Sequence, residues 1–229
     1  MFGLISAMKV EMDHIVAALE NGINERIGIM DFQTGTLWGH EAVLCVCGPG
    51  KVNAALCTQA MIQRYHPESV MNLGVAGSVS DKISIGDVVV GTYAVQHDMD
   101  TSPLGDPPGY IPGINMIRLP LDAQMQERLR SALSALPDIK GVFGGIATGD
   151  QFLHSAEHRI KVRERFEALC CEMEGGAVAH VCYANSVPCA IVRAISDNAD
   201  GGSDVDFLKF VNRAAENSVR LVKRFLQEN

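Results

Sequence analysis

The feature that most constrains the fold of this chain is a regular alternation between two kinds of hydrophobic pattern. Short apolar runs with strand character cover residues 3–6, 42–47, 70–73, 87–90, 141–148, 168–173 and 189–195. Helical patterns are expected near residues 9–20, 51–65, 122–136, 155–166, 175–185 and 206–227. Strands that alternate with helices form a mostly parallel or mixed sheet that helices cover on both faces. We therefore predict one α/β domain over residues 1–229.

Composition limits the kind of partner that the chain can have. The 229 residues are 47% hydrophobic and 20% charged, which suits a globular protein with a substantial core. Because the net charge is −8 and the basic residues are scattered, we expect a small-molecule partner and no nucleic acid. Seven irregularly placed cysteines indicate no disulfide framework and suit a reducing cytoplasm. The first residues resemble neither a secretory signal nor a membrane span.

Unusual residues follow several of the predicted strands. Ligands of such sheets bind beyond the carboxyl ends of the strands, so these positions are candidates for a site. Gly77 ends a glycine-rich segment after one strand, and Phe152 follows another. Arg193 and Asp197 share one side of an otherwise apolar strand, next to Ser196. They are candidate site residues, and a structural ion pair is the alternative.

Three carboxylates lie in otherwise apolar surroundings. In the stretch Cys-Glu-Met-Glu-Gly-Gly at residues 171–176, alternation along a strand would turn Glu172 and Glu174 to the same side. An unpaired carboxylate there is expensive to desolvate, so something must compensate it. Glu11 lies on the apolar stripe of the first predicted helix. The alternatives are a solvated strand end for the pair and a side chain that reaches solvent for Glu11.

Two further motifs resemble known sites without completing them. Residues 48–52 follow a strand and open a helix, but Val52 and Asn53 stand where phosphate-binding loops need other residues. His154, Glu157 and His158 fit an inverted zinc-peptidase pattern, yet no third ligand is evident. A solvent-facing helix start explains these residues equally well, so we expect no metal.

The segment 97–118 interrupts the alternation of strands and helices. It is rich in proline and glycine, and it is too long for an ordinary connection within a compact domain. We therefore expect this segment, which we call the arm, to take part in function.

Six motifs, taken together and in this order, resemble the purine nucleoside phosphorylase superfamily. They are Ala7-Met8-x-x-Glu11, Gly48-x-Gly50-Lys51, Gly74-Val75-Ala76-Gly77, Gly149-Asp150-x-Phe152, Glu172-Met173-Glu174-Gly175 and Arg193-Ala194-Ile195-Ser196-Asp197. Within that superfamily the chain most resembles the 5′-methylthioadenosine/S-adenosylhomocysteine nucleosidases. The resemblance covers nearly the whole chain. It implies a three-layer α/β/α sandwich around a twisted mixed β-sheet.

The resemblance also implies a role for each matched position. Glu11 would be the base that activates water, Asp197 the acid that protonates the leaving purine, and Arg193 would position the water. Glu174 would accept hydrogen bonds from the ribose hydroxyls, with Glu172 in support. The other residues expected to bind substrate are Met8, Pro49, Gly77, Phe152, Leu153, Met173, Ser196 and Phe207. Among these, Phe152 would stack on adenine, the Leu153 backbone would meet the edge of the base, and Phe207 would close over the ligand.

A homodimer is a further implication of the resemblance. The arm would cross the interface between two subunits. There Leu104, Tyr110 and Pro112 would line the 5′-thioalkyl pocket of the neighbouring subunit, together with Met8 and Pro49.

The implied reaction is hydrolysis of the N-glycosidic bond of methylthioadenosine and S-adenosylhomocysteine. It would release adenine and the 5′-thioribose product without a metal or an organic cofactor. Phosphorolysis is an alternative, although Asn72 and Val75 stand near the glycines where phosphorylases of the superfamily hold phosphate with arginine and serine. Val75 also leaves open how the attacking water is held. Two further alternatives are hydrolysis of aminodeoxyfutalosine and nucleoside binding without catalysis.

Overall fold

The computed structural model describes residues 1–197 and 203–227, and for residues 203–214 it describes the backbone alone. The strands are β1 (Phe2–Ser6), β2 (Leu19–Ile27), β3 (Met30–Leu37), β4 (His40–Val46), β5 (Ser69–Ser78), β6 (Val88–Gln96), β7 (Leu119–Pro120), β8 (Gly141–Thr148), β9 (Ala168–Glu172) and β10 (Cys189–Asp197). The helices are α1 (Lys9–Val16), α2 (Lys51–Tyr65), α3 (Ala123–Ser134), α4 (Ala156–Phe166), α5 (Gly175–Ala184) and α6 (Ser203–Gln227). The 3-10 turn η1 (Ser102–Leu104) lies in the arm.

The strands form one mixed sheet that is partly closed on itself. Its order is β10-β6-β8-β9-β5-β1-β4-β3-β2, with β7 paired to β6. Strand β5 also pairs in parallel with β10, so β10, β6, β8, β9 and β5 make a ring. Strand β5 can take part in both arrangements because it is ten residues long: its start pairs with β1 and its last residues with β9. The α/β fold with a mixed sheet that the resemblance implied is confirmed.

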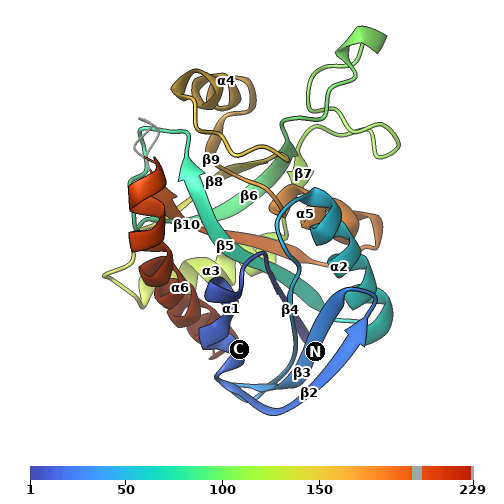
Figure 1. The fold of residues 1–229 in the computed structure, drawn as a ribbon, viewed down its shortest axis with the longest axis vertical. Coiled ribbons are helices and arrows are strands. Elements are labelled where there is room, and N and C mark those ends of the chain that lie inside the picture. The colour runs from blue at the N-terminus through green and yellow to red at the C-terminus, as the bar shows by residue number, and fades with distance from the viewer. Residues whose placement is uncertain (198–202, 228–229) are drawn as a thin grey trace.

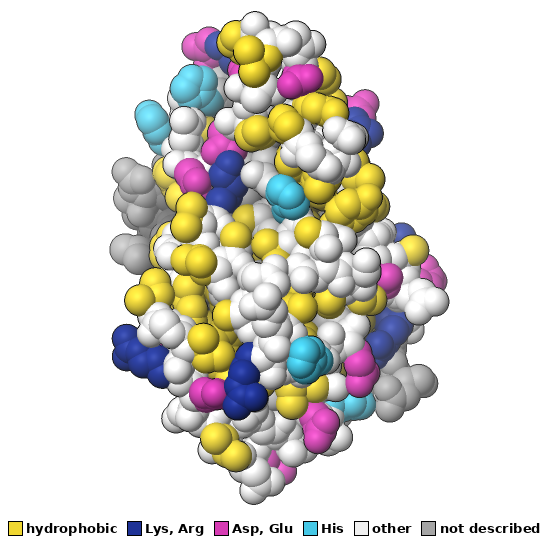
Figure 2. Space-filling model, turned by 90° about the vertical axis from the view of Figure 1, so that its right-hand side faces the viewer, with side chains coloured by type: hydrophobic (Ala, Val, Ile, Leu, Met, Phe, Trp, Pro, Cys, Tyr) yellow, Lys and Arg dark blue, Asp and Glu magenta, His cyan; other side chains and the backbone are white. Residues whose placement is uncertain are grey.

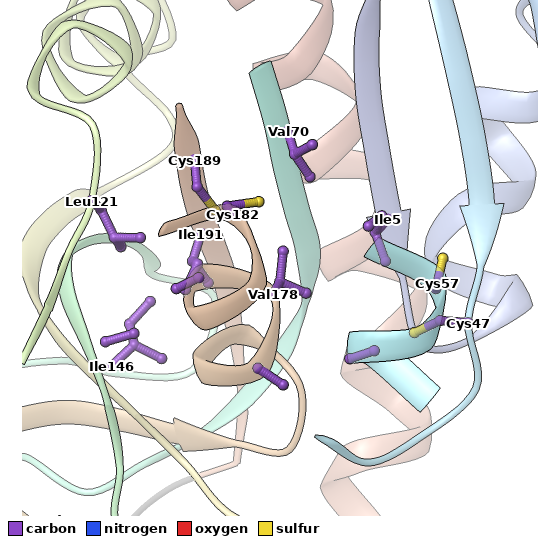
Figure 3. Close-up of a cluster of buried hydrophobic side chains, with 14 of the residues drawn as sticks. Ile5, Cys47, Cys57, Val70, Leu121, Ile146, Val178, Cys182, Cys189 and Ile191 are labelled. Carbon is purple, nitrogen blue, oxygen red and sulfur yellow. The ribbon is translucent and has the colours of Figure 1, made fainter. Parts of the chain in front are cut away.

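Helices cover both faces of the sheet (Figure 1). Helices α2 and α5 pack together on one face, over a buried cluster that includes Ile5, Val178 and Ile191 (Figure 3). Helices α1, α3 and α6 cover the other face, where the apolar cluster includes Met12 and Phe225. Helix α4 lies at one end of the molecule, beside β8 and β9. The last residues of β5, β8, β9 and β10, which are Ser78, Thr148, Glu172 and Asp197, are all buried.

The first region in which the structure differs from the sequence prediction is the beginning of the chain. The helix expected over residues 9–20 ends at Val16, and residues 19–37 form the antiparallel hairpin of β2 and β3, which was not predicted. Strand β2 is the outer strand of the sheet and most of its residues are exposed. A strand that buries neither face has no alternating apolar pattern, and that is the reason it was missed.

A second difference concerns the glycine-rich segment of β5. The strand expected to end at residue 73 continues to Ser78, so Gly74 and Gly77 lie within it and not in a turn after it. They remain paired with β10 on one side, Gly74 opposite Arg193 and Gly77 opposite Asp197. The glycines therefore present bare backbone to the charged residues of the neighbouring strand.

The cysteines and the length of the helices bear on two expectations from the sequence. All seven cysteines are free and buried. Among the residues that the structure describes, no helix has both the length and the apolar character that crossing a bilayer requires.

Candidate active site

A cavity of about 220 Å³ lies at the carboxyl ends of β1, β4, β5, β9 and β10. It is lined by ten of the residues that the sequence analysis selected: Met8, Glu11, Pro49, Gly77, Phe152, Glu172, Met173, Glu174, Ser196 and Asp197. A second cavity of about 30 Å³ shares part of this lining and adds Leu153 and Arg159. The two cavities form one site because they share six lining residues: Gly77, Phe152, Cys171, Glu172, Met173 and Asp197.

Three backbone amides hold the carboxylate of Glu11. The N–H groups of Ala7 and Met8 donate to its Oε2 at 3.1 and 2.9 Å, and that of Val75 donates to its Oε1 at 3.0 Å. The side chain is only 4% exposed. Burial raises the pKa of Glu11, whereas the charge of Arg193 and the backbone hydrogen bonds act in the opposite direction. Glu11 is thus a fixed, buried carboxyl group that can exchange a proton with a molecule bound in the cavity.

Arg193 lies beside Glu11 with one donor to spare. Its Nη1 donates to the carbonyl of Asn72 at 3.3 Å, and its Nη2 donates to Asn72 Oδ1 and to Glu172 Oε2. Its buried Nε has no hydrogen-bond partner among the described residues. A Cβ on Gly74 would lie 2.9 Å from Glu11 Oε1 and 3.5 Å from Arg193 Cζ, so both side chains meet over this glycine. A buried N–H without a partner is costly, which suits a place for a bound molecule here.

Glu172 is fully engaged within the protein. Its Oε2 accepts from Arg193 and from the backbone N–H groups of Glu174 at 3.0 Å and Gly175 at 2.6 Å. Its Oε1 accepts from the hydroxyl of Thr148. Glu172 therefore satisfies the buried charge of Arg193 and fixes the turn into α5, which is consistent with the supporting part expected for it.

Glu174 has capacity left for a ligand. It stands at the N-cap position of α5, two residues past the end of β9 at Glu172, so helix entry and not strand alternation turns it into the cavity. Its Oε1 accepts from the Gly50 N–H at 2.8 Å, and its Oε2 accepts no hydrogen bond from the described residues. Burial and the nearby charge of Glu172 raise the pKa of Glu174 to about 7.

Asp197 is held at both oxygens. Nη2 of Arg159 donates to Oδ2 at 2.7 Å, and the hydroxyl of Ser196 donates to Oδ1 at 3.0 Å. A Cβ on Gly77 would lie 2.9 Å from Oδ2, so only a glycine lets the carboxylate lie against β5. The pairing of β10 with β5 shifts register between Ile195 and Asp197, and this irregularity brings Asp197 to the cavity.

Three polar residues of the site were not predicted as site residues from the sequence: Arg159, Thr148 and Asn72. All three are buried and hydrogen-bonded to a predicted site residue. One signal was present for Arg159, because it lies in phase with Val162 and Phe166 on the apolar side of α4. A basic residue on that stripe needs a buried anion, and Asp197 is that anion.

Five predicted residues line neither cavity. Arg193 is one of them: it is buried and paired with Glu172. The other four are Leu104, Tyr110, Pro112 and Phe207. Leu104, Tyr110 and Pro112 lie on the arm, where Leu104 is 84% exposed and Tyr110 donates to Asn115 Oδ1. Their expected place was in the pocket of a neighbouring subunit, so this prediction remains open. The side chain of Phe207 lies outside the described residues.

The zinc-peptidase pattern forms no metal site in the described part of the chain. His154 precedes α4, Ser155 is the N-cap residue of α4, and Glu157 pairs with Lys161 one turn further on. Among the side chains that the structure describes, three or more His, Cys, Asp or Glu residues nowhere converge as metal ligands would.

Comparisons with known proteins agree with this geometry. The family model of the Phosphorylase superfamily matches residues 1–227. The chain is 33% identical to the 5′-methylthioadenosine/S-adenosylhomocysteine nucleosidase of Shewanella sp. strain W3-18-1, covering 99% of this chain and 98% of that one.

Solved structures of the same kind are similar over the full length. The nucleosidase of that name from Neisseria meningitidis, in complex with methylthio-immucillin-A, superposes with a TM-score of 0.95 at 33% identity, covering 100% and 99% of the two chains. The futalosine hydrolase of Helicobacter pylori strain 26695 has a TM-score of 0.94 at 32% identity, covering 100% and 97%.

The hydrogen bonds of the two glutamates predict different effects of their substitution on stability. Glu172→Gln should lower the free energy of unfolding by about 3 to 5 kcal/mol, because it leaves the buried charge of Arg193 without its anion. Glu174→Gln should change it far less, since the amide oxygen can still accept from Gly50. Urea unfolding at neutral pH measures both values. Equal losses in the two variants would contradict the division of roles.

Proposed function

This chain belongs to the phosphorylase superfamily, and on that premise we propose that it hydrolyses the N-glycosidic bond of 5′-methylthioadenosine and S-adenosylhomocysteine. The products are adenine and the corresponding 5′-thioribose, and residues 1–229 act as one domain. The observation that carries the proposal is the placement of three buried carboxylates, Glu11, Glu174 and Asp197, around one cavity. The names of the similar nucleosidases support the same reaction.

Water is the attacking molecule in this proposal, and Glu11 is the base. The three amides that point at Glu11 are the kind of donors that hold a phosphate in other proteins, but here they are already used. A phosphate bound at this place would be repelled by the negative charge of Glu11. A water between Glu11 and the unpaired Nε of Arg193 would donate to the carboxylate and accept from Nε. These two groups can hold the water although the side chain of Val75 forms no hydrogen bond.

The ribose is bound by Glu174 and Met173. The 2′ and 3′ hydroxyls donate to the carboxylate of Glu174, whose Oε2 accepts nothing else among the described residues, and Met173 packs beneath the sugar. These hydrogen bonds compensate the desolvation of Glu174 that burial imposes. The predicted substrate contacts of Met8 and Pro49 belong to the same proposal.

The leaving base occupies the end of the cavity near Asp197. Departure of adenine leaves positive charge on the ribose, so the purine must leave as a neutral molecule. Asp197, protonated in the reactive complex and oriented by Ser196, donates its proton to N7. Phe152, half exposed at the cavity mouth, stacks on the base, and the Leu153 backbone meets its edge.

Aminodeoxyfutalosine is a second candidate substrate. The similar futalosine hydrolase of Helicobacter pylori has nearly the same TM-score as the Neisseria nucleosidase, so global similarity does not separate the two. The two substrates differ in the 5′ substituent, which lies at the side of the cavity formed by Met8 and Pro49.

A homodimer is part of the proposal. Figure 2 shows hydrophobic side chains gathered on the upper part of the face that carries the arm and scattered over the middle of this face. Val52 and Leu56 of α2 and Leu104 of the arm are among the most exposed large apolar residues of the described chain. Contact with a second copy would remove these surfaces from water. The free thiols are compatible with the proposed cytoplasmic location.

The test of the function is base release from a panel of nucleosides. Purified protein is mixed with methylthioadenosine, S-adenosylhomocysteine, adenosine, inosine and aminodeoxyfutalosine, each with and without phosphate. We expect the highest kcat/KM for the first two and no dependence on phosphate. Release that requires phosphate would identify a phosphorylase, and release from aminodeoxyfutalosine alone would identify the second candidate.

The two catalytic carboxylates can be tested separately. Glu11→Gln and Asp197→Asn should each lower kcat by on the order of 10² to 10⁴, the usual contribution of a general base or acid. Binding of substrate should change much less, because neither residue is expected to hold the ribose. Single-turnover kinetics and equilibrium binding measure the two effects, with Glu41→Gln as an exposed control far from the cavity. Wild-type turnover by either variant would remove that residue from the mechanism.

The raised pKa of Glu174 predicts the low-pH behaviour of the enzyme. Only the carboxylate form accepts both ribose hydroxyls, so kcat/KM should fall as pH drops below about 7, where Glu174 becomes protonated. In the complex these hydrogen bonds favour the carboxylate, so kcat should fall only at lower pH. Glu174→Gln should weaken substrate binding by about 1.5 to 3 kcal/mol for each hydrogen bond lost. The fall of kcat/KM below about pH 7 should no longer occur at the same pH in this variant. If kcat/KM of the variant falls at the same low pH as that of the wild type, the titrating group is not Glu174.

The proposed dimer predicts the mass of the active species. Light scattering at assay concentration should give twice the mass of one chain. Leu104→Asp should lower activity toward the 5′-thio substrates more than Ile29→Asp, an exposed apolar residue at the β2–β3 turn. A fully active monomer would exclude the shared pocket.

A further inference from the structure

We propose that Arg159 is a positioning residue that holds Asp197 as a carboxylate in the unliganded protein, so that a purine base binds together with one proton. This inference rests on the proposed function, because it gives Asp197 the role of acid for the leaving base. It concerns a side chain that no motif of the family resemblance contains.

Arg159 ties together three segments around the base end of the cavity. It lies on α4 and is 2% exposed. Its Nε donates to the carbonyl of Leu153 at 2.7 Å, its Nη1 to the carbonyl of Ser78 at 3.2 Å, and its Nη2 to Asp197 Oδ2 at 2.7 Å. These acceptors belong to the loop before α4, the end of β5 and the end of β10. One planar guanidinium thus fixes the acid and the loop that meets the edge of the base.

Among the described residues that line the two cavities, Arg159 is the one cation beside Asp197. The other titratable groups that line the two cavities are Glu11 on α1, Cys171 and Glu172 on β9 and Glu174 before α5, and none of them is a cation. Arg193, on the same strand as Asp197, is paired with Glu172. Asp197 and Arg159 form a buried ion pair with both side chains 2% exposed. A buried carboxylate needs such a partner, so Arg159 favours the ionised form of Asp197.

An ionised Asp197 cannot bind the base as the proposed reaction requires. N7 of a 9-substituted adenine is an acceptor, and two acceptors in contact repel each other unless a proton lies between them. Base binding must therefore bring a proton from solvent onto Asp197. When the glycosidic bond breaks, its electron pair goes to the purine, the proton moves from Asp197 to N7, and Asp197 returns to the carboxylate that Arg159 holds. On the other face, the water oxygen bonds to the anomeric carbon and its proton goes to Glu11.

Proton uptake can be measured on the wild-type protein without turnover. Calorimetric titration with 9-methyladenine near pH 8, in buffers that differ in ionisation enthalpy, should show an uptake of about one proton for each molecule bound. The matched ligand 9-methyl-7-deazaadenine has a carbon in place of N7 and should bind with an uptake near zero. Equal proton uptake for the two ligands, or none for either, would overturn the proposal.

Substitution of Arg159 tests whether it is the cause. Arg159→Gln removes the charge and keeps a hydrogen-bonding group, so proton uptake near pH 8 should fall. The ratio of kcat/KM at high pH to that at neutral pH should rise by about tenfold or more, since a neighbouring cation commonly shifts carboxylate ionisation by that factor. Arg159→Lys keeps the charge and should keep the wild-type ratio. Arg163→Gln, on the same helix but 37% exposed, is the control.

The outcomes separate the possible failures. A role in structure alone would lower kcat/KM by the same factor at every pH in the Gln and Lys variants, and this result would overturn the proposal. If Arg159→Gln does not fold, the wild-type calorimetry and the pH ratio of Arg159→Lys still decide. A wild-type protein that releases no base from any nucleoside would contradict the proposed function. In that case the role of Arg159 would still be tested by comparing proton uptake on binding of 9-methyladenine between the wild type and the Arg159 variants.

Discussion

The structure depends on one electrostatic constraint: buried charges must be compensated where they stand. Glu11, Glu172, Glu174, Asp197, Arg159 and Arg193 all lie at one end of the sheet, and none is more than 7% exposed. Removing these groups from water is costly unless partners and hydrogen bonds are already in place. Arg193 pairs with Glu172 and Arg159 with Asp197, while backbone amides hold Glu11. Only Glu174 keeps an oxygen without a described donor, and it faces the cavity.

The closed part of the sheet makes this arrangement possible. Because β5 pairs with β10 along most of its length, Gly74 and Gly77 lie opposite Arg193 and Asp197. Any side chain at these glycines would displace the carboxylates of Glu11 and Asp197. Strand pairing thus does for the site what a loop does in many enzymes: it sets the distance between the charged groups. Regular backbone holds them more rigidly than a loop could.

Much of the fold and most of the site could be predicted from the sequence, and the failures have physical reasons. Arg193, Asp197 and Glu172 were found because charged residues stand out in apolar strands. The hairpin of β2 and β3 was missed because β2 buries too little of itself to leave a pattern. Arg159 was missed because a basic residue on a helix is normally assumed to reach solvent. Its partner, Asp197, is 38 residues further along the chain, and only the fold brings the two together.

The three amides around Glu11 have a consequence for how such an enzyme meets its surroundings. A group tethered to the chain competes for a binding place at an effective concentration that dissolved ions rarely reach. Here the tethered carboxylate is four residues from Ala7 and three from Met8, and it is already oriented by both. A dissolved anion would have to displace the Glu11 carboxylate from these amides, and the negative charge of Glu11 would then repel it. The proposed hydrolase is therefore insulated from the anion content of its solution, since the chain supplies its own anion.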